Sequence, residues 1–150
     1  MASPKTITIK GDPIQVELLA DAAITPGHLV ERTTTGAKVH ATAGGNCQKM
    51  FALEDEMKGG EIGTAYTTSN KAQFGIFRPG DQVYAIIATN QTINVGDFLE
   101  SAGSGNLREH TPAVDSASYA GTVYSNAIVG VAVSAVTTTS AVGRCIVEII

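Results

Sequence analysis

The chain has 150 residues, 43% of them hydrophobic, and a formal net charge of −4 at pH 7. That length is enough to enclose one hydrophobic core without staples, so we expect a single globular domain. The sequence has no cluster of lysine and arginine and no run of about 18 apolar residues, which excludes nucleic acid as a direct ligand and predicts no membrane contact.

The first predicted element is an N-terminal arm, residues 1–10, with the sequence MASPKTITIK. It contains no apolar run long enough for a signal peptide, so we expect synthesis in the cytosol. Within the arm, Thr6–Ile9 alternates as a β-strand does, and Pro4 and Pro13 limit the strand on both sides. Two interpretations stay open: the segment pairs with an exposed edge of another chain, or it is the first strand of its own sheet.

Short β-rich runs separated by Gly, Pro, Asn and Ser follow along residues 11–150. Helical spacing is absent except for a turn or two, at Ala52–Lys58 or Ala113–Tyr119. The sequence therefore predicts an all-β fold: a single-domain β-sandwich or partly closed β-barrel of the jelly-roll or tulip type, with short loops and an extended N-terminal arm. After the arm, the predicted strands are Ile14–Leu19, His28–Arg32, Lys38–His40, Met50–Leu53, Gln73–Phe77, Gln82–Ala88, Phe98–Ser101, Leu107–Glu109, Ala127–Val136 and Arg144–Ile150.

One phrase occurs twice in the sequence, as ITPGHLVERTTTG and as INVGDFLESAGSG, and all matched residues share one offset. Each copy indicates a strand, a turn at a glycine that adopts positive φ, a second strand, a second glycine turn and a third strand. We predict two related β-meanders, residues 14–42 and 83–111, although chance recurrence of β-turn chemistry stays open. Packed face to face, the meanders would bury alternate apolar residues, namely Val16, Leu18, Leu29, Val83, Ile86 and Phe98.

The residues able to carry chemistry do not form a recognisable site. His28, His40 and His110 lack the spacing of metal ligands, and His28 fits a solvent-facing turn. The acidic run Glu54–Glu56 lacks the alternating oxygen ligands of a calcium loop and is interpreted as a solvated or partner-facing loop. Cys47 and Cys145 are expected to be buried thiols. We therefore expect no catalytic residue, no metal and no cofactor.

Four motifs in the middle of the chain carry a resemblance to a known family. They are ALED at Ala52–Asp55, the pair Ala65-Tyr66, RPGDQVYA at Arg78–Ala85, and the run Ile93–Leu107 with the pattern I..GDFLES.G.G.L. In this order they resemble the head decoration, or cement, proteins of tailed bacteriophages. The resemblance is clear over the central two-fifths of the chain.

This resemblance implies a structural virion protein on the outer capsid surface, with the major capsid protein as its partner. It also implies a homo-oligomer, with a trimer favoured over a dimer, an N-terminal arm that reaches neighbouring capsomers, and no active site. The candidate capsid or oligomer contacts are the arm, the acidic run and one arginine: Ser3, Pro4, Lys5, Thr6, Ile7, Thr8, Ile9, Glu54, Asp55, Glu56 and Arg78.

Two functions of other classes remain as alternatives. The first is a non-viral adhesive or ligand-binding β-sandwich module, against which stand the missing signal peptide and the scarcity of aromatic residues. The second is a small β-barrel enzyme, which would require His28, His40 and His110 to converge in space.

Overall fold

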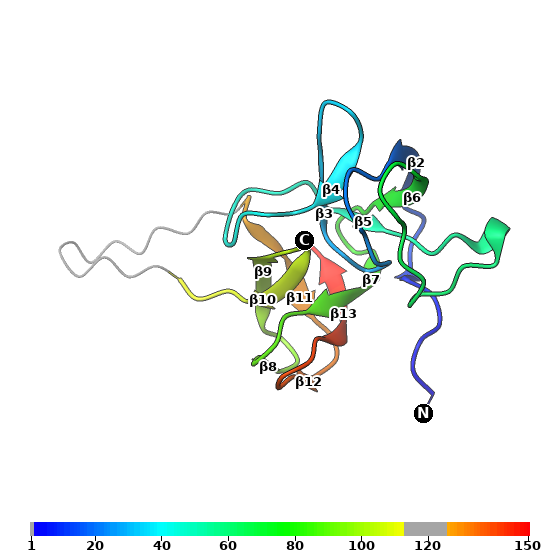
Figure 1. Cartoon of the computed structure of the whole chain (residues 1–150). Helices are drawn as coiled ribbons and strands as arrows, with labels where there is room; N and C mark the ends of the chain where they lie inside the picture. The colour runs from blue at the N-terminus through cyan, green and yellow to red at the C-terminus, as the bar shows by residue number, and fades with distance from the viewer. Residues whose placement is uncertain (1, 113–125) are drawn as a thin grey trace.

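A computed structural model of the chain describes residues 2–112 and 126–150. The regular secondary structure of these residues is β-strand, apart from one short 3-10 helix, η1 (Glu56–Lys58). The predicted all-β class is therefore confirmed (Figure 1). The strands are β1 (Thr8–Lys10), β2 (Ile14–Leu19), β3 (Val30–Arg32), β4 (Ala37–Val39), β5 (Met50–Ala52), β6 (Lys71–Ile76), β7 (Gln82–Ile87), β8 (Thr92–Ile93), β9 (Phe98–Gly103), β10 (Asn106–Glu109), β11 (Ile128–Ala132), β12 (Val136–Thr137) and β13 (Gly143–Ile149).

The C-terminal half forms a closed five-stranded barrel. Its strands follow the order β7-β10-β9-β11-β13, and a further pairing of β13 with β7 closes the ring. All these neighbours are antiparallel except β10 and β7, which are parallel. Closure removes the unpaired edges of the sheet, because every barrel strand then has a neighbour on both sides. We call this unit, residues 82–149, the C-terminal barrel.

The N-terminal half repeats the same order of neighbours in a looser form. β2 pairs with β6, β6 with β5, and β3 with β4, all antiparallel. An antiparallel bridge from Leu29 to Phe51 joins the third strand to the fifth, and a parallel bridge from Ala20 to Ala37 joins the end of β2 to the start of β4. Strand for strand, β2, β3, β4, β5 and β6 thus correspond to β7, β9, β10, β11 and β13. We call this unit, residues 14–76, the N-terminal ring.

The repeated phrase forms the same turn in both units. In the ring, the Gly27 N–H donates to the Ala52 carbonyl, and the Ala52 N–H donates to the carbonyl of the residue after Gly27. In the barrel, Gly96 and Ala132 make the same two bonds. Gly27 and Gly96 also have nearly equal positive φ angles, +95° and +97°, a conformation that glycine adopts at little cost. Ala52 and Ala132 are therefore equivalent positions, one on each unit.

Two clusters of buried side chains form the core. One fills the N-terminal ring around Phe74, Met50 and Val30. The other fills the barrel and extends to Leu29 and Phe51 of the ring. The ring and the barrel consequently share buried apolar surface, which at about 25 cal/mol per Å² is the main favourable term in folding.

The predicted strands all overlap observed ones, with corrections at their ends. The predicted strand Ala127–Val136 is two strands, β11 and β12, and the two-residue strands β8 and β12 are too short to stand out in the sequence. The first possible helix contains η1, whereas Ala113–Tyr119 lies outside the described residues.

The prediction of buried apolar faces was wrong for Phe98, which is 48% exposed, while its neighbour Leu99 is fully buried. Successive side chains of a strand point to opposite faces, so the burial of Leu99 directs Phe98 outward. Val16 and Leu18 are half-buried, and Leu29, Val83 and Ile86 are buried as predicted. Cys145 is buried but Cys47 is only partly so, and both are free thiols.

Candidate functional site

A groove beside the N-terminal strand brings together the arm and the acidic run that the sequence singled out separately. Its cavity has a volume of about 350 Å³. The lining comes from the arm, the turn before β2, the acidic run with η1, and two glutamines on β2 and β6: Thr6, Thr8, Gly11, Asp12, Pro13, Gln15, Leu53, Glu54, Asp55, Glu56, Met57 and Gln73. We call this feature the arm groove.

Backbone contacts fix both walls of the arm groove. The Ile7 N–H donates to the Glu54 carboxylate at 3.1 Å, which ties the arm to the acidic run. The Arg78 guanidinium donates to the Asp12 carbonyl at 2.7 Å and holds the turn before β2. Gly59, in the left-handed conformation, ends η1 directly after the acidic run. Arg78 therefore supports the groove from outside its lining.

The arm is only partly free, which corrects one of the predicted contacts. Ile7 is 0% exposed and belongs to the core of the barrel, so its side chain is not available to a partner. Thr8 pairs with Val83, so β1 lies in its own sheet beside β7. Of the open interpretations, the structure thus favours a first strand of the same chain. Ser3, Lys5 and Thr6 are exposed, while Pro4, Thr8 and Ile9 are half-buried.

The charges of the arm groove are mainly negative. Glu56 is exposed, Glu54 and Asp55 are half-buried, and Lys58 lies 3.9 Å from the Asp55 carboxylate. A smaller adjoining cavity brings Lys5 close to Glu54, Glu56 and another acid, Glu61. Met57, 99% exposed, stands beside these acids. Such a surface fits basic and apolar side chains of a protein partner, because opposite charges steer encounter and exposed apolar groups gain by burial.

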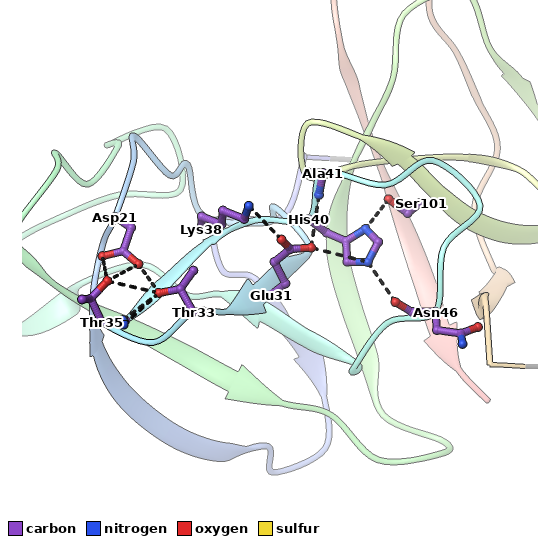
Figure 2. Close-up of polar contacts among 10 residues, drawn as sticks. Asp21, Glu31, Thr33, Thr35, Lys38, His40, Ala41, Asn46 and Ser101 are labelled. Carbon is purple, nitrogen blue, oxygen red and sulfur yellow. Dashed lines mark hydrogen bonds and ion pairs between the residues drawn. The ribbon is translucent and has the colours of Figure 1, made fainter.

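The three histidines have different surroundings. His40, which sequence reasoning did not place, is buried between the ring and the barrel (Figure 2). Its Nδ1 lies 2.8 Å from the Ser101 hydroxyl of β9, and its Nε2 lies 3.0 Å from the Asn46 carbonyl and 3.8 Å from Glu31. Because the Asn46 carbonyl only accepts, Nε2 carries a proton, and Nδ1 bonds to the Ser101 hydroxyl.

The pair Ser101 and His40 has the geometry of a hydroxyl facing a base, but it lies in the interior. Ser101 is 0% exposed, so a substrate has no path to its oxygen in this structure. Beside it, the Glu31 carboxylate contacts Lys38 at 3.2 Å and accepts from the Ala41 N–H. Burial raises the pKa of Glu31, but these donors and His40 hold it below its ordinary value. The cluster joins ring to barrel.

Figure 2 also shows how the β3–β4 turn is closed beside this cluster. The hydroxyls of Thr33 and Thr35 donate to the Asp21 carboxylate, and the Gly36 N–H donates to the Thr33 hydroxyl at 2.8 Å. These threonines thus fix the turn through their side chains.

The barrel carries a second cluster of the same composition. Glu100 of β9 contacts Arg108 and His110 at 2.7 Å each, as Glu31 of β3 contacts Lys38 and His40. In both units a glutamate faces a cation on the next strand, and a histidine follows two residues later. That spacing is visible in the sequence and could have located the clusters.

His28 is partly buried, not solvent-facing as predicted. Its Nδ1 accepts the Thr25 N–H at 3.1 Å, the bond that the Asp97 carboxylate makes with Asn94 in the barrel. Burial, together with the positive charge of Arg144 and partly opposed by the Asn106 side chain, lowers the pKa of His28 to about 4. His28 is thus a neutral turn residue.

No metal-binding cluster of three or more His, Cys, Asp or Glu side chains occurs within residues 2–112 and 126–150. Across the same residues, no helix has the length and apolar character needed to span a bilayer.

Comparison with known proteins gives a likeness at the level of fold. No family model matches the chain, and no curated protein matches it. Among solved structures, the crystal structure of the head fiber gp8.5 N base in bacteriophage phi29 matches with a TM-score of 0.53 and 10% identity, over 91% of this chain and 97% of that one. The shared fold therefore includes both the ring and the barrel.

Proposed function

We propose that this protein is a structural virion protein that binds the exterior of an assembled phage capsid and stabilises it by bridging subunits of the major capsid protein. The observation that carries the proposal is the fold, which matches the base of a phage head fiber over nearly the whole length of both chains. The phage decoration motifs of the sequence point in the same direction. We propose no enzymatic activity, because the best nucleophile–base pair, Ser101 and His40, is buried and joins the two units.

The arm groove is the surface that we propose for contact with the capsid. It combines exposed residues of the arm with the acids Glu54 and Glu56 and the exposed Met57. A protein that binds assembled shells and ignores free subunits shifts the equilibrium toward the shell by mass action. A homo-oligomer, with a trimer favoured, would contact several capsid subunits at once and gain avidity from the high effective concentration.

Binding to undecorated shells tests the proposal. Purified protein mixed with shells that lack decoration should sediment with them, appear as added density on their outer surface, and raise their melting temperature. Failure to bind any shell, including that of its own host phage, would contradict the proposal.

A pair of variants tests the role of the arm groove. Glu56→Gln removes one exposed acid and should weaken shell binding about fivefold, since an exposed ion pair contributes up to about 1 kcal/mol. Ser140→Lys changes the net charge equally at an exposed site in the β12–β13 turn and should leave binding unchanged. Equal weakening by both variants would indicate a general charge effect and exclude the groove.

A further inference from the structure

The contact between the ring and the barrel within one chain has two sides. On the ring side, the Gly27 carbonyl accepts the Ile86 N–H of β7 at 3.2 Å. A Cβ added to Gly27 would lie 2.9 Å from the Tyr84 carbonyl, so the turn lies directly against β7. Leu29 and Leu53, which flank this turn, are 0% and 7% exposed. The ring therefore buries the face that contains the Gly27 turn, and this face packs against the edge of β7 in the barrel.

The barrel has the same face, but no part of residues 2–112 and 126–150 covers it. Gly96, the equivalent of Gly27, has no atom within 4 Å of an added Cβ. Phe98 corresponds to Leu29 and is 48% exposed, and Val133, next to Ala132, corresponds to Leu53 and is 37% exposed. We call Gly96, Phe98 and Val133 the donor face. Three exposed residues thus occupy positions whose equivalents in the ring are in contact or buried.

In the ring, the strand that corresponds to β7 is β2. Among the described residues, β2 is the end strand of the sheet β2-β6-β5, so its edge away from β6 is available to a partner. In β7, the Tyr84 N–H donates to Ile7 and the Ile86 N–H donates to Gly27. The equivalent residues of β2 are Glu17 and Leu19, because Val16 faces Phe74 of β6 as Val83 faces Val147 of β13, and Ala20 bridges Ala37 as Ile87 bridges Leu107. Both side chains are exposed. We call the stretch Glu17–Leu19 the acceptor edge.

The direction of the backbone groups on the acceptor edge follows from the strand geometry. The Ala20 N–H donates to the Asn70 carbonyl on the β6 side. Successive N–H groups of a strand point to alternate edges. The N–H groups of Glu17 and Leu19 therefore point away from β6, toward the side where β7 receives its additional partners.

From these two exposed surfaces we infer that copies of the chain join head to tail, with the donor face of one copy on the acceptor edge of the next. The Leu19 N–H would then donate to the Gly96 carbonyl of the neighbour, as Ile86 donates to Gly27 within the chain. Figure 1 places β2 at the upper right and β9 at the lower left, so the two surfaces lie on different sides of the molecule. Each chain can therefore bind two neighbours.

A head-to-tail contact closes into a ring or grows into a filament. Closure with three copies is the form expected here, in line with the trimer favoured by the resemblance, and it would alternate N-terminal rings and C-terminal barrels around one axis. The inference concerns the free protein and does not depend on shell binding, so either proposal can fail alone.

The mass of the protein in solution tests the inference, measured by sedimentation at about 50 μM, a concentration above the micromolar range typical of weak specific contacts. The wild type should have three times the 15.5 kDa of one chain. Phe98→Glu, on an exposed position, should be a folded monomer. Met57→Glu is the control. It introduces the same charge at another apolar residue, which is 99% exposed and lies outside the donor face, and it should stay trimeric.

A mixing experiment separates head-to-tail contacts from symmetric ones. Leu19→Pro removes the outward N–H of the acceptor edge, a change that edge strands tolerate, and should also give a monomer; Glu17→Pro replaces it if the first variant does not fold. The donor variant Phe98→Glu and the acceptor variant each keep one intact surface. Mixed together, they should form a one-to-one heterodimer of about 31 kDa, twice the single-chain mass.

Three outcomes would overturn the inference. They are a monomeric wild type, single variants that remain trimeric, and a mixture of the donor and acceptor variants that stays monomeric. A dimer that Phe98→Glu abolishes but Leu19→Pro leaves intact would identify a symmetric contact through Phe98 and would also exclude the head-to-tail arrangement.

Discussion

His28 and Asp97 show how one turn accommodates two different side chains. Each accepts the N–H of the residue three positions earlier, at 3.1 Å for His28 and 2.7 Å for Asp97. The surroundings then separate their chemistry. His28 lies beside Arg144 at the contact between ring and barrel, where burial and the adjacent positive charge lower its pKa to about 4.

This pKa predicts a pH-dependent component of stability. The unfolded chain binds a proton at His28 near the ordinary value of 6.5, and the folded chain does so only near pH 4. The contribution is therefore complete above pH 6.5 and is lost as the pH falls toward 4. His28→Asn keeps an oxygen to accept the Thr25 N–H but does not titrate. Urea unfolding of both proteins from pH 7 to pH 4 should show the wild type losing more stability than the variant; a constant difference would contradict this.

At the scale of elements, the glycine turn is one structure in two environments. Gly27 is pressed against β7, whereas Gly96 meets open space, although their φ angles differ by only 2°. A side chain added at either glycine would therefore be strained by the positive φ. Only at Gly27 would it also clash with neighbouring atoms of the described chain.

Alanine at each glycine should separate these two costs. Gly96→Ala should lower the free energy of unfolding by about 1–3 kcal/mol through strain at positive φ. Gly27→Ala should lower it by about 1–3 kcal/mol more, because the Cβ meets the Tyr84 carbonyl and the Arg144 guanidinium. Urea unfolding of both variants, at a concentration where they have the same mass, measures the difference. Equal losses would mean that ring and barrel do not touch at this turn.

Sequence reasoning located the elements better than it located their neighbours. Ile14–Leu19 was predicted with its observed bounds, since alternation and flanking turn residues mark a strand locally. The arm and the acidic run were each selected as contact candidates, yet the bond between Ile7 and Glu54 spans 47 positions, and no local pattern encodes such a distance. The same holds for His40 and Ser101, 61 positions apart. The predicted burial of Phe98 was wrong for another reason. The alternation of side chains along a strand defines two faces, but it does not indicate which face the rest of the chain covers.

At the scale of the whole molecule, the two units depend on each other. Leu29 and Phe51 belong to the ring by strand pairing, but their side chains lie in the core of the barrel. The buried bond between His40 of the ring and Ser101 of the barrel adds a polar link. Separation would expose apolar surface and break the bond between the His40 Nδ1 and the Ser101 hydroxyl. A buried polar atom left without its partner costs about 1–3 kcal/mol.

We therefore expect one cooperative unfolding transition for the whole chain. Calorimetry of the Phe98→Glu variant, chosen so that association between copies does not contribute, should give a calorimetric enthalpy equal to the van't Hoff enthalpy. Ser101→Ala in the same background should lower the melting temperature without splitting the transition. Two resolved transitions would indicate that ring and barrel fold independently.

The pairing of β1 with β7 has a consequence for the order of synthesis. Thr8 leaves the ribosome long before Val83, its partner in the sheet. At about 5–20 residues per second, β1 waits several seconds for the strand that will hold it. The N-terminal ring has all of its own strands only near the end of that interval, when β6 has been made. Until then the arm, with Ile7 not yet buried, is an unpaired strand that can meet other nascent chains. Translation speed through residues 10–83 thus sets how long each new molecule is exposed to pairing with the wrong neighbour.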